Sequence, residues 1–276
     1  MGRVTSRHKV LRLRGDVPVL RPDTLAGEEP LEIRLGGAPL TVTMRTPGND
    51  FDLVAGFLVA EGVIGAREEL AGLRYCSGVD AETGENTYNV VDAVLGPGAR
   101  TPASLHRNLL TTSACGICGR ETIEAVRTRS RWPVADDPVR IAPDVLYGLP
   151  GTLRAAQRTF ASTGGLHAAG LFTADGTLLC AREDVGRHNA VDKVIGWALR
   201  EGRLPLSGTV LLVSGRASFE LTQKAAMAGI PVLAAVSAPS SLAVDLAEEV
   251  GVTLVGFLRD RTANVYAGAE RIALPG

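Results

Sequence analysis

The sequence predicts an α/β protein in which an N-terminal α+β domain precedes a C-terminal domain built on a largely parallel sheet. In the second half of the chain, short apolar segments alternate with helical patterns through brief loops, as in successive β-α-β units. In the first half, segments of alternating apolar and polar residues surround one helical pattern. With 276 residues, 45% of them hydrophobic, the chain is long enough for two modest domains.

Composition excludes several classes of function. The net charge of −1 gives no reason to expect a nucleic-acid partner. The longest apolar stretches have the length of strands, so no membrane span is expected. Four cysteines are too few for a disulfide framework in a chain of this size, and no secretory signal is visible. The expected location is therefore the cytoplasm, with reduced thiols.

The first half contains a small number of clear elements. The expected order is a strand at residues 31–35, a strand at 40–44, a helix at 50–61 and a strand at 88–94. Gly36 and Gly37 form the turn between the first two strands, and Asn49 with Asp50 caps the helix. A helix at 121–128 ends the first domain, at residues 1–130. Residues 131–143, which hold three prolines, form the expected linker.

The second domain, at residues 144–276, is more regular. It is expected to contain a hairpin at 167–172 and 178–182, helices at 190–200, 219–228 and 242–250, and strands at 210–213, 230–236 and 252–257. The connections are short, which favours right-handed crossovers and a largely parallel sheet.

Four loops follow the strands of this domain, at residues 183–189, 214–218, 237–241 and 258–261. Because the carboxyl ends of parallel strands meet at one edge, these loops are expected to line a ligand site. Ser214, Gly215 and Arg216 combine a hydroxyl, a close backbone approach and a guanidinium at a helix start, which are the parts of a phosphate site. The other basic residues in these loops are Arg187, His188, Arg259 and Arg261. Together they predict an extended anionic ligand.

Three residues near this edge allow simpler interpretations. His188 could act as a base, contact the ligand or cap its helix, and a capping or core role is the simpler one. His167 is expected to be a packed, hydrogen-bonded histidine at a strand start. Glu220 and Lys224, four residues apart on one helix, are most simply a surface ion pair.

Cys115 and Cys118 form a C-x-x-C motif flanked by Gly116 and Gly119. Zinc binding is disfavoured, because no second C-x-x-C or H-x₃₋₅-H is present and no histidine begins the H-x-E of a zinc nucleotide deaminase. Dithiol redox chemistry is disfavoured by the lack of a thioredoxin-like context. A persulfide carrier fits best, since a cysteine at a helix start beside Arg120 favours the thiolate.

These motifs together resemble the formate dehydrogenase accessory sulfurtransferase family, known as FdhD. The matching segments are residues 112–119, 163–169, 182–193, 214–220 and 253–259. The run Glu-Asp-Val-Gly-Arg-His-Asn-Ala-Val-Asp-Lys at 183–193 is the most specific of them. The resemblance spans residues 50–266, nearly the whole chain.

The resemblance implies a cytoplasmic sulfurtransferase that serves as a chaperone. It would accept sulfur from a cysteine desulfurase and pass it to the molybdenum, or tungsten, of bis-molybdopterin guanine dinucleotide before that cofactor enters formate dehydrogenase. The implied fold of the second domain is an α/β/α sandwich like that of cytidine deaminase, without structural zinc. The implied assembly is a homodimer.

Carried over by position, the resemblance makes Cys115 the persulfide-bearing cysteine and Cys118 its partner in transfer. The implied cofactor-binding segment is Phe257, Leu258, Arg259, Asp260, Arg261 and Thr262. A non-catalytic chaperone that only binds the molybdenum cofactor is the alternative function.

Overall fold

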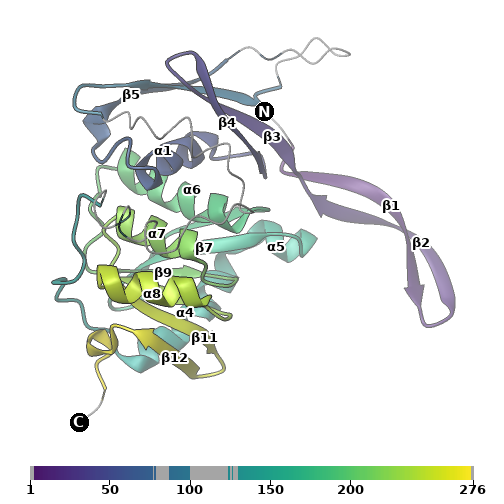
Figure 1. The fold of residues 1–276 in the computed structure, drawn as a ribbon. Helices are drawn as coiled ribbons and strands as arrows, with labels where there is room; N and C mark the ends of the chain where they lie inside the picture. Colours follow the sequence, from purple (N-terminus) through teal and green to yellow (C-terminus); the bar gives the residue numbers. More distant parts are fainter. Residues whose placement is uncertain are drawn as a thin grey trace.

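The computed structural model describes residues 3–76, 78, 87–99, 124, 126 and 130–274 of the chain. These residues form a two-stranded, a four-stranded and a six-stranded sheet together with the helices that cover them (Figure 1). The α/β fold predicted from the sequence is confirmed.

The four-stranded sheet has the order β4-β3-β6-β5. Its strands are β3 (Glu29–Leu35), β4 (Ala38–Arg45), β5 (Leu70–Tyr75) and β6 (Val90–Leu95). The predicted hairpin and the strand at 88–94 are confirmed as β3, β4 and β6, whereas β5 was not predicted. Helix α1 (Asp50–Ala60) packs on this sheet with nearly every side chain buried.

Helix α1 does not begin with the side-chain cap that the sequence suggested. Asn49 occupies the N-cap position in the left-handed region, with φ 55°, and its side chain makes no capping hydrogen bond. The carboxylate of Asp50 instead accepts two hydrogen bonds of 3.1 Å from the buried guanidinium of Arg45. Asp50, the acidic residue at the start of α1, therefore binds Arg45 of β4 instead of capping the helix.

The six-stranded sheet has the order β12-β11-β10-β9-β7-β8. Its strands are β7 (His167–Thr173), β8 (Leu178–Asp184), β9 (Thr209–Val213), β10 (Val232–Ala235), β11 (Thr253–Arg259) and β12 (Thr262–Ala267). Strands β9, β10 and β11 pair in parallel, and β7 is antiparallel to both β8 and β9. Strands β8 to β11 thus run in one direction, as predicted, although β7 is inserted between β8 and β9.

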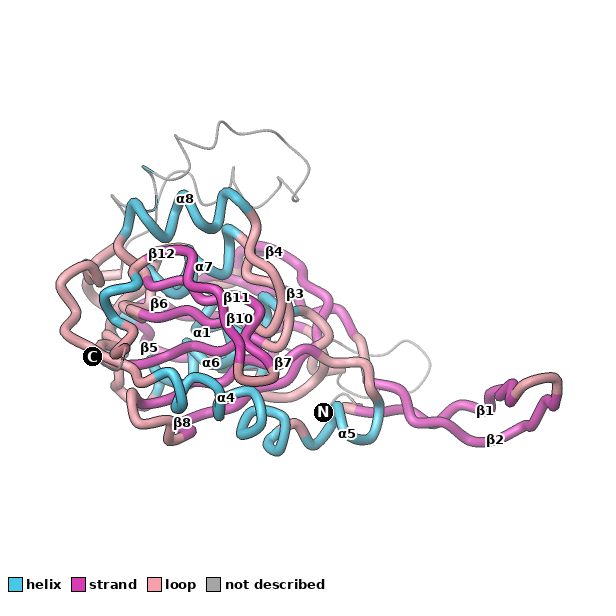
Figure 2. Tube along the Cα trace, turned by 90° about the horizontal axis from the view of Figure 1, so that it is seen from below, coloured by secondary structure: helices cyan, strands magenta, loops and turns pink. Residues whose placement is uncertain are grey.

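Alternating side chains of the central strands belong to two separate hydrophobic cores, one on each face of the sheet. Val210 and Leu212 of β9 face one core, which they share with α4 (Pro143–Ala156). Leu211 and Val213 face the other core, beneath α6 (Arg187–Arg200), α7 (Phe219–Met227) and α8 (Ser241–Val250). Because side chains alternate across a strand, the sheet lies between two helical layers (Figure 2).

The two halves of the chain meet where α1 crosses α6. A Cβ atom built on Gly56 would lie 1.8 Å from the Asp192 carbonyl oxygen, and one built on Gly196 would lie 1.8 Å from the Asp52 carbonyl oxygen. Only glycine allows this approach of the two backbones. The core beneath α6 contains residues of both halves; the predicted domain division at 131–143 stays a prediction.

Besides β5 and β12, two features of the fold were not predicted. Helix α4 covers the second face of the six-stranded sheet, and the short helix α5 (Arg158–Thr163) follows it. Beside α5, β1 (Thr5–Arg14) and β2 (Val17–Ala26) form a two-stranded ribbon that projects from the body (Figures 1 and 2). We call this ribbon the arm.

Candidate functional site

The loops after β8, β9, β10 and β11 lie at one edge of the six-stranded sheet, and backbone hydrogen bonds join the loop after β9, the loop after β10 and the end of β11. The N–H of Ser237 donates to the carbonyl of Gly215 at 3.2 Å, and the N–H of Phe257 donates to the carbonyl of Ser237 at 3.1 Å. Ser214 is tied to β7, since its Oγ accepts a 2.9 Å hydrogen bond from the N–H of Ala168. The structure therefore brings Ser214, Gly215 and Phe257 together, and we call this line of loops the sheet edge.

Basic and imidazole groups converge at the start of α6, beside the sheet edge. His167 begins β7, and burial, followed by the positive charges of Arg187 and His188, lowers the pKa of its imidazole. A neutral imidazole offers one donor and one acceptor. The Nε of Arg187 is buried and, among the described residues, has no hydrogen-bond partner. A buried donor of this kind is costly unless a water or a ligand satisfies it.

His188 is neither a helix cap nor a core residue. Its side chain is 35% exposed, and its Nε2 lies 3.3 Å from Ser218 Oγ and 3.7 Å from Glu220 Oε2. The interaction with His188 is the largest cause that lowers the pKa of Glu220 to about 2. His188 therefore bridges the starts of α6 and α7, and the hydroxyl of Ser218 is engaged there rather than in a helix cap. The simpler interpretation of His188 is wrong.

A pocket of about 640 Å³ adjoins the sheet edge on the side of α4 and α5. Its lining includes Ser214 and His167 from the sheet edge together with Arg154, Gln157 and Phe160 from the helical side. The guanidinium of Arg154 lies 4.2 Å above the ring of Phe160. Largely apolar walls with a few polar groups are typical of small-molecule sites. The α4 and α5 residues were missed from the sequence, although Leu146, Leu149 and Leu153 give α4 an apolar face.

Four of the remaining predicted ligand residues, Arg259, Asp260, Arg261 and Thr262, lie at the turn from β11 to β12. Asp260 and Arg261 form this turn with φ values of 50° and 58°, and Arg259 pairs with Thr262 across it. Arg261 contacts α4, because its Nη2 donates a 2.6 Å hydrogen bond to Asp144. Leu258 is buried, and Arg216 is exposed at the sheet edge. The assignment of this turn to cofactor binding stays a prediction.

The prediction that Glu220 and Lys224 form a surface ion pair is wrong. Lys224 Nζ lies 2.7 and 2.9 Å from the two carboxylate oxygens of Asp192, and its side chain is only 10% exposed. Burial raises the pKa of Asp192, against the opposing effect of Lys224. The spacing of four residues between Glu220 and Lys224 takes account of neighbours within α7 only. Helix α6 packs beside α7, and its Asp192 supplies a carboxylate nearer to Lys224. This ion pair lines a second pocket, of about 400 Å³, that His188 and Glu220 also reach.

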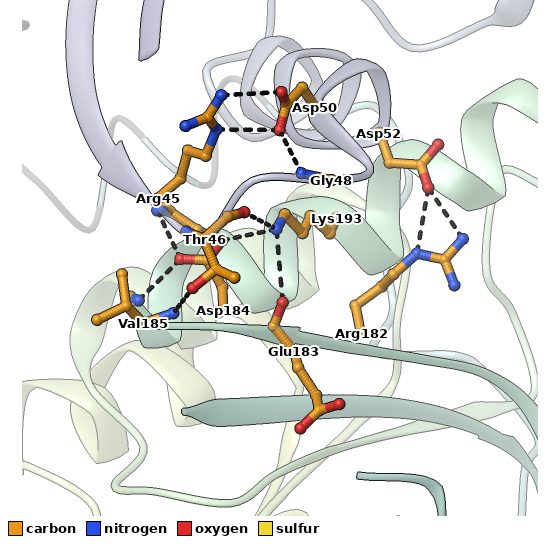
Figure 3. A network of polar contacts seen from close by, with 12 residues as sticks. Arg45, Thr46, Gly48, Asp50, Asp52, Arg182, Glu183, Asp184, Val185 and Lys193 are labelled. Atoms are coloured by element: carbon orange, nitrogen blue, oxygen red, sulfur yellow. Dashed lines mark hydrogen bonds and ion pairs between the residues drawn. The ribbon is translucent and has the colours of Figure 1, made fainter. Parts of the chain in front are cut away.

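Most of the specific run at 183–193 joins the two halves of the protein (Figure 3). Lys193 Nζ lies 2.7 Å from Asp184 Oδ2 and 2.9 Å from the carbonyl oxygen of Thr46, on the N-terminal half. Asp184 also accepts a 3.2 Å hydrogen bond from the N–H of Thr46. Asn189 donates to the carbonyl of Met44 at 2.8 Å. We call Thr46, Asp184, Asn189 and Lys193 the clasp.

A second set of charged contacts reinforces the clasp. Asp52 of α1 accepts hydrogen bonds of 3.1 and 2.9 Å from Arg182 and forms an ion pair with Arg200. The carboxylate of Glu183 accepts the N–H groups of Thr159 and Phe160 at the start of α5. The most specific sequence motif is thus mainly structural, and Arg187 and His188 are its members at the sheet edge.

The predicted sulfur-carrying residues, Cys115 and Cys118, lie outside the described residues, as does most of the helix expected at 121–128. Their roles stay predictions. Of the other two cysteines, Cys180 is buried in β8, and burial raises the pKa of its thiol to about 11. Cys180 is therefore unsuited to act as a thiolate. The expectation of no structural zinc also stays a prediction.

An α/β fold with loops and a pocket at the carboxyl ends of its strands is typical of proteins that bind a small-molecule ligand. Within the part of the chain that the structure describes, no helix is long and apolar enough to cross a membrane. Residues 26–273 match the model of the FdhD/NarQ family, and the chain belongs to that family. The family predicted from the sequence motifs is confirmed.

Relatives and a solved structure agree with this assignment. The chain is 64% identical over 276 residues to the sulfur carrier protein FdhD of Streptomyces coelicolor, covering 99% of this chain and 98% of the relative. It is 58% identical over 275 residues to the protein of the same name from Mycobacterium tuberculosis, covering 99% and 100%. A crystal structure assigned as a formate dehydrogenase accessory protein from Desulfotalea psychrophila matches with a TM-score of 0.76 and 25% identity, covering 98% of this chain and all of that one.

Proposed function

We propose that this protein is a sulfurtransferase that accepts sulfur from a cysteine desulfurase and delivers it to the molybdenum, or tungsten, of bis-molybdopterin guanine dinucleotide for formate dehydrogenase. The match to the FdhD/NarQ family over residues 26–273 is the observation that carries this proposal. The names of the relatives, sulfur carrier protein FdhD, support the sulfur-carrying part. The name of the solved structure supports the connection with formate dehydrogenase.

Sulfur loading is a thiol–persulfide exchange. The thiolate of Cys115 attacks the outer sulfur of the persulfide on the desulfurase. A new S–S bond forms on Cys115, the S–S bond of the donor breaks, and the donor leaves as a thiolate. Oxidation states balance, since one persulfide replaces another.

Sulfur release requires two electrons, because the outer sulfur of a persulfide must become sulfide. In our proposal the thiolate of Cys118 attacks the inner sulfur, on Cys115. A Cys115–Cys118 disulfide forms, and sulfide leaves as the ligand of the acceptor metal. The two thiols supply the two electrons, and a small thiol reductant restores the dithiol. Cys118 is thus the displacing residue, one of the two roles that the sequence leaves open.

The sheet edge is the proposed binding site of the acceptor. The cofactor carries two pyrophosphates, which the exposed guanidinium of Arg216 and the backbone groups at the start of α7 could bind. The unpartnered Nε of Arg187 supplies a further donor at the same edge. The adjoining pocket, with Phe160 beneath Arg154, has the size and the walls for a heterocyclic ring.

Mass spectrometry after incubation with a cysteine desulfurase and cysteine tests the sulfur-carrying role. The peptide that holds Cys115 should gain the mass of one sulfur atom, and Cys115→Ala should abolish the gain. Cys180→Ala is the matched control and should load normally, since the Cys180 thiol is buried. Full activation of formate dehydrogenase by Cys115→Ala would refute sulfur transfer and leave the binding-only chaperone.

Calorimetric titration with guanosine diphosphate tests the sheet edge. Arg216→Ala should weaken binding about tenfold to a hundredfold, since a hydrogen bond to a charged group contributes about 1.5–3 kcal/mol. Arg203→Ala is the control, because the Arg203 guanidinium stacks on Trp197 near the far end of α6. Equal affinity of the Arg216 variant and the wild type would remove Arg216 from the site.

Assembly and location form part of the same proposal. We expect a homodimer that works in the cytoplasm, where the desulfurase and the immature formate dehydrogenase would be its partners. Sedimentation at micromolar concentration measures the first point directly.

A further inference from the structure

The arm exposes large apolar side chains that the rest of the described chain does not cover. Leu11, Leu13 and Leu20 are 59%, 69% and 77% exposed. An isolated two-stranded ribbon is marginally stable in water. Clustered apolar groups on a surface mark a site of contact with another molecule. The arm projects from the described part of the body in both views, and contact with a second molecule would cover these leucines (Figures 1 and 2).

The strand register gathers the leucines of the arm on one of its two faces. Directly opposed residues, such as Leu11 with Leu20 and Leu13 with Pro18, place their side chains on the same face. Leu11, Leu13, Pro18 and Leu20 lie together on one face near the turn of the arm, which we call the leucine face, whereas Lys9 and Arg7 lie on that face nearer the body. The other face mixes Arg12, Arg14 and Arg21 with exposed valines, Val17 and Val19. Only the leucine face near the turn is therefore uniformly apolar.

Charge indicates what the arm contacts. Residues 5–26 contain five basic residues (Arg7, Lys9, Arg12, Arg14 and Arg21) and two acidic residues (Asp16 and Asp23), a net charge of +3. Because the whole chain has a net charge of −1, the remainder carries −4. The body of a second copy thus has the charge opposite to that of the arm. Pairing one arm with another would instead place like charges side by side.

The body has a small exposed apolar surface that could pack against the leucines of the arm. This surface lies on β4, an edge strand of the four-stranded sheet. Val42 and Met44 are 62% and 48% exposed, and their spacing of two residues places them on one face of the strand. Val4, Val94, Val265 and Leu274, the other large apolar side chains exposed outside the arm among the described residues, do not form such a pair within one strand.

We propose that the arm of one copy docks through its leucine face on Val42 and Met44 of a second copy. Each copy gives one arm and receives one, as a two-fold axis requires. This inference rests on the homodimer proposed above and is independent of sulfur transfer.

Sedimentation of three proteins tests the arm. The wild type should be a dimer, and Leu11→Glu with Leu20→Glu should be a monomer at the same micromolar concentration. Val265→Glu is the matched control, an exposed valine outside the arm, and should remain dimeric. A monomeric wild type would overturn the homodimer together with this inference. A dimeric double variant would overturn the arm alone.

A photo-crosslinking residue at position 20 tests the docking site without disturbing the leucine face elsewhere. In a mixture of ¹⁵N-labelled and unlabelled protein, crosslinks should join the two isotopes and map to the peptide that contains Val42 and Met44. Crosslinks that never join the two isotopes, or that map to another peptide, would overturn the docking site. Sulfur loading of Cys115 in the double variant should equal that of the wild type, so failure of this inference is distinct from failure of the proposed function.

Discussion

Replacing Lys193 with methionine tests whether the clasp holds the two halves of the protein together. Lys193 and Asp184 are 2% and 0% exposed, and their charged atoms lie 2.7 Å apart. Removing one partner of a buried pair costs about 3–5 kcal/mol. Asp184 would keep the N–H donors of Thr46, Gly186 and Asn189, which favours the lower end of that range, about 3 kcal/mol.

Thermal unfolding followed by circular dichroism measures this loss. At roughly 2–4 °C per kcal/mol for a chain of this size class, Lys193→Met should lower the melting temperature by about 6–12 °C. Asp144→Asn is the control, because its ion pair with Arg261 has a similar length, 2.6 Å, but its partners are 77% and 72% exposed. An exposed pair contributes about 0–1 kcal/mol, so the control should melt close to the wild type.

The reasoning about the clasp fails if Lys193→Met unfolds within about 1 °C of the wild type. The reasoning also fails if Asp144→Asn loses as much stability as Lys193→Met, since burial of an ion pair would then have no effect on its contribution. Replacing both members by apolar residues should not restore stability, because three N–H groups would lose the Asp184 carboxylate as their acceptor.

Three further changes test separate parts of the structure. Gly196→Ala should cost about 1–3 kcal/mol in denaturant unfolding, since its Cβ would meet the Asp52 carbonyl oxygen, whereas Gly148→Ala, in open space on α4, should stabilise by about 0.5–1 kcal/mol. Because the pKa of Glu220 is lowered to about 2, its stabilising effect is present above its ordinary pKa and is lost as pH falls. The stability difference between wild type and Glu220→Gln should therefore shrink from about pH 4.5 towards pH 2, and a constant difference would contradict this. Iodoacetamide at pH 8 should modify Cys180 far more slowly in the native than in the unfolded protein, as peptide mass spectrometry would show; equal rates would disprove its burial.

The β-α-β repeats could be predicted because their signal is local. Val210–Val213 is an uninterrupted apolar run, and such a run between two helical patterns has few alternatives to a buried strand. The direction of strands β8 to β11, and with it the sheet edge, follows from short connections. The insertion of β7 between β8 and β9 could not be predicted, since it depends on strand pairing at long range.

The clasp could not be predicted for a similar reason. Thr46 and Lys193 are separated by 147 positions, so nothing in the local pattern at either residue indicates the other. The sequence therefore assigned Arg187 and His188 of this run to the ligand site and gave no role to Asp184, Asn189 or Lys193. The ion-pair partner of Lys224 was predicted wrongly because Glu220, its nearest acidic residue along the helix, is not its nearest acidic residue in space.

Helix α4 was missed because its proline content suggests irregular structure. Pro143 occupies the first turn, where no N–H is needed, and Pro150 lies inside the helix. The arm was missed because its alternation has no core to face within one chain. Both errors follow from reading local composition without the surrounding surfaces.

The crossing of α1 and α6 has a consequence for how the protein is made. Helix α1 leaves the ribosome long before α6, since 140 residues separate Gly56 from Gly196, where the two helices cross. At roughly 5–20 residues per second, synthesis of that interval takes about 7–30 s. During this time one side of an apolar helix, with Leu53, Val54 and Leu58, lacks the partner that buries it in the native state. The nascent chain is therefore most prone to aggregation before residue 200 has emerged, and slowing translation beyond that point should leave its yield unchanged.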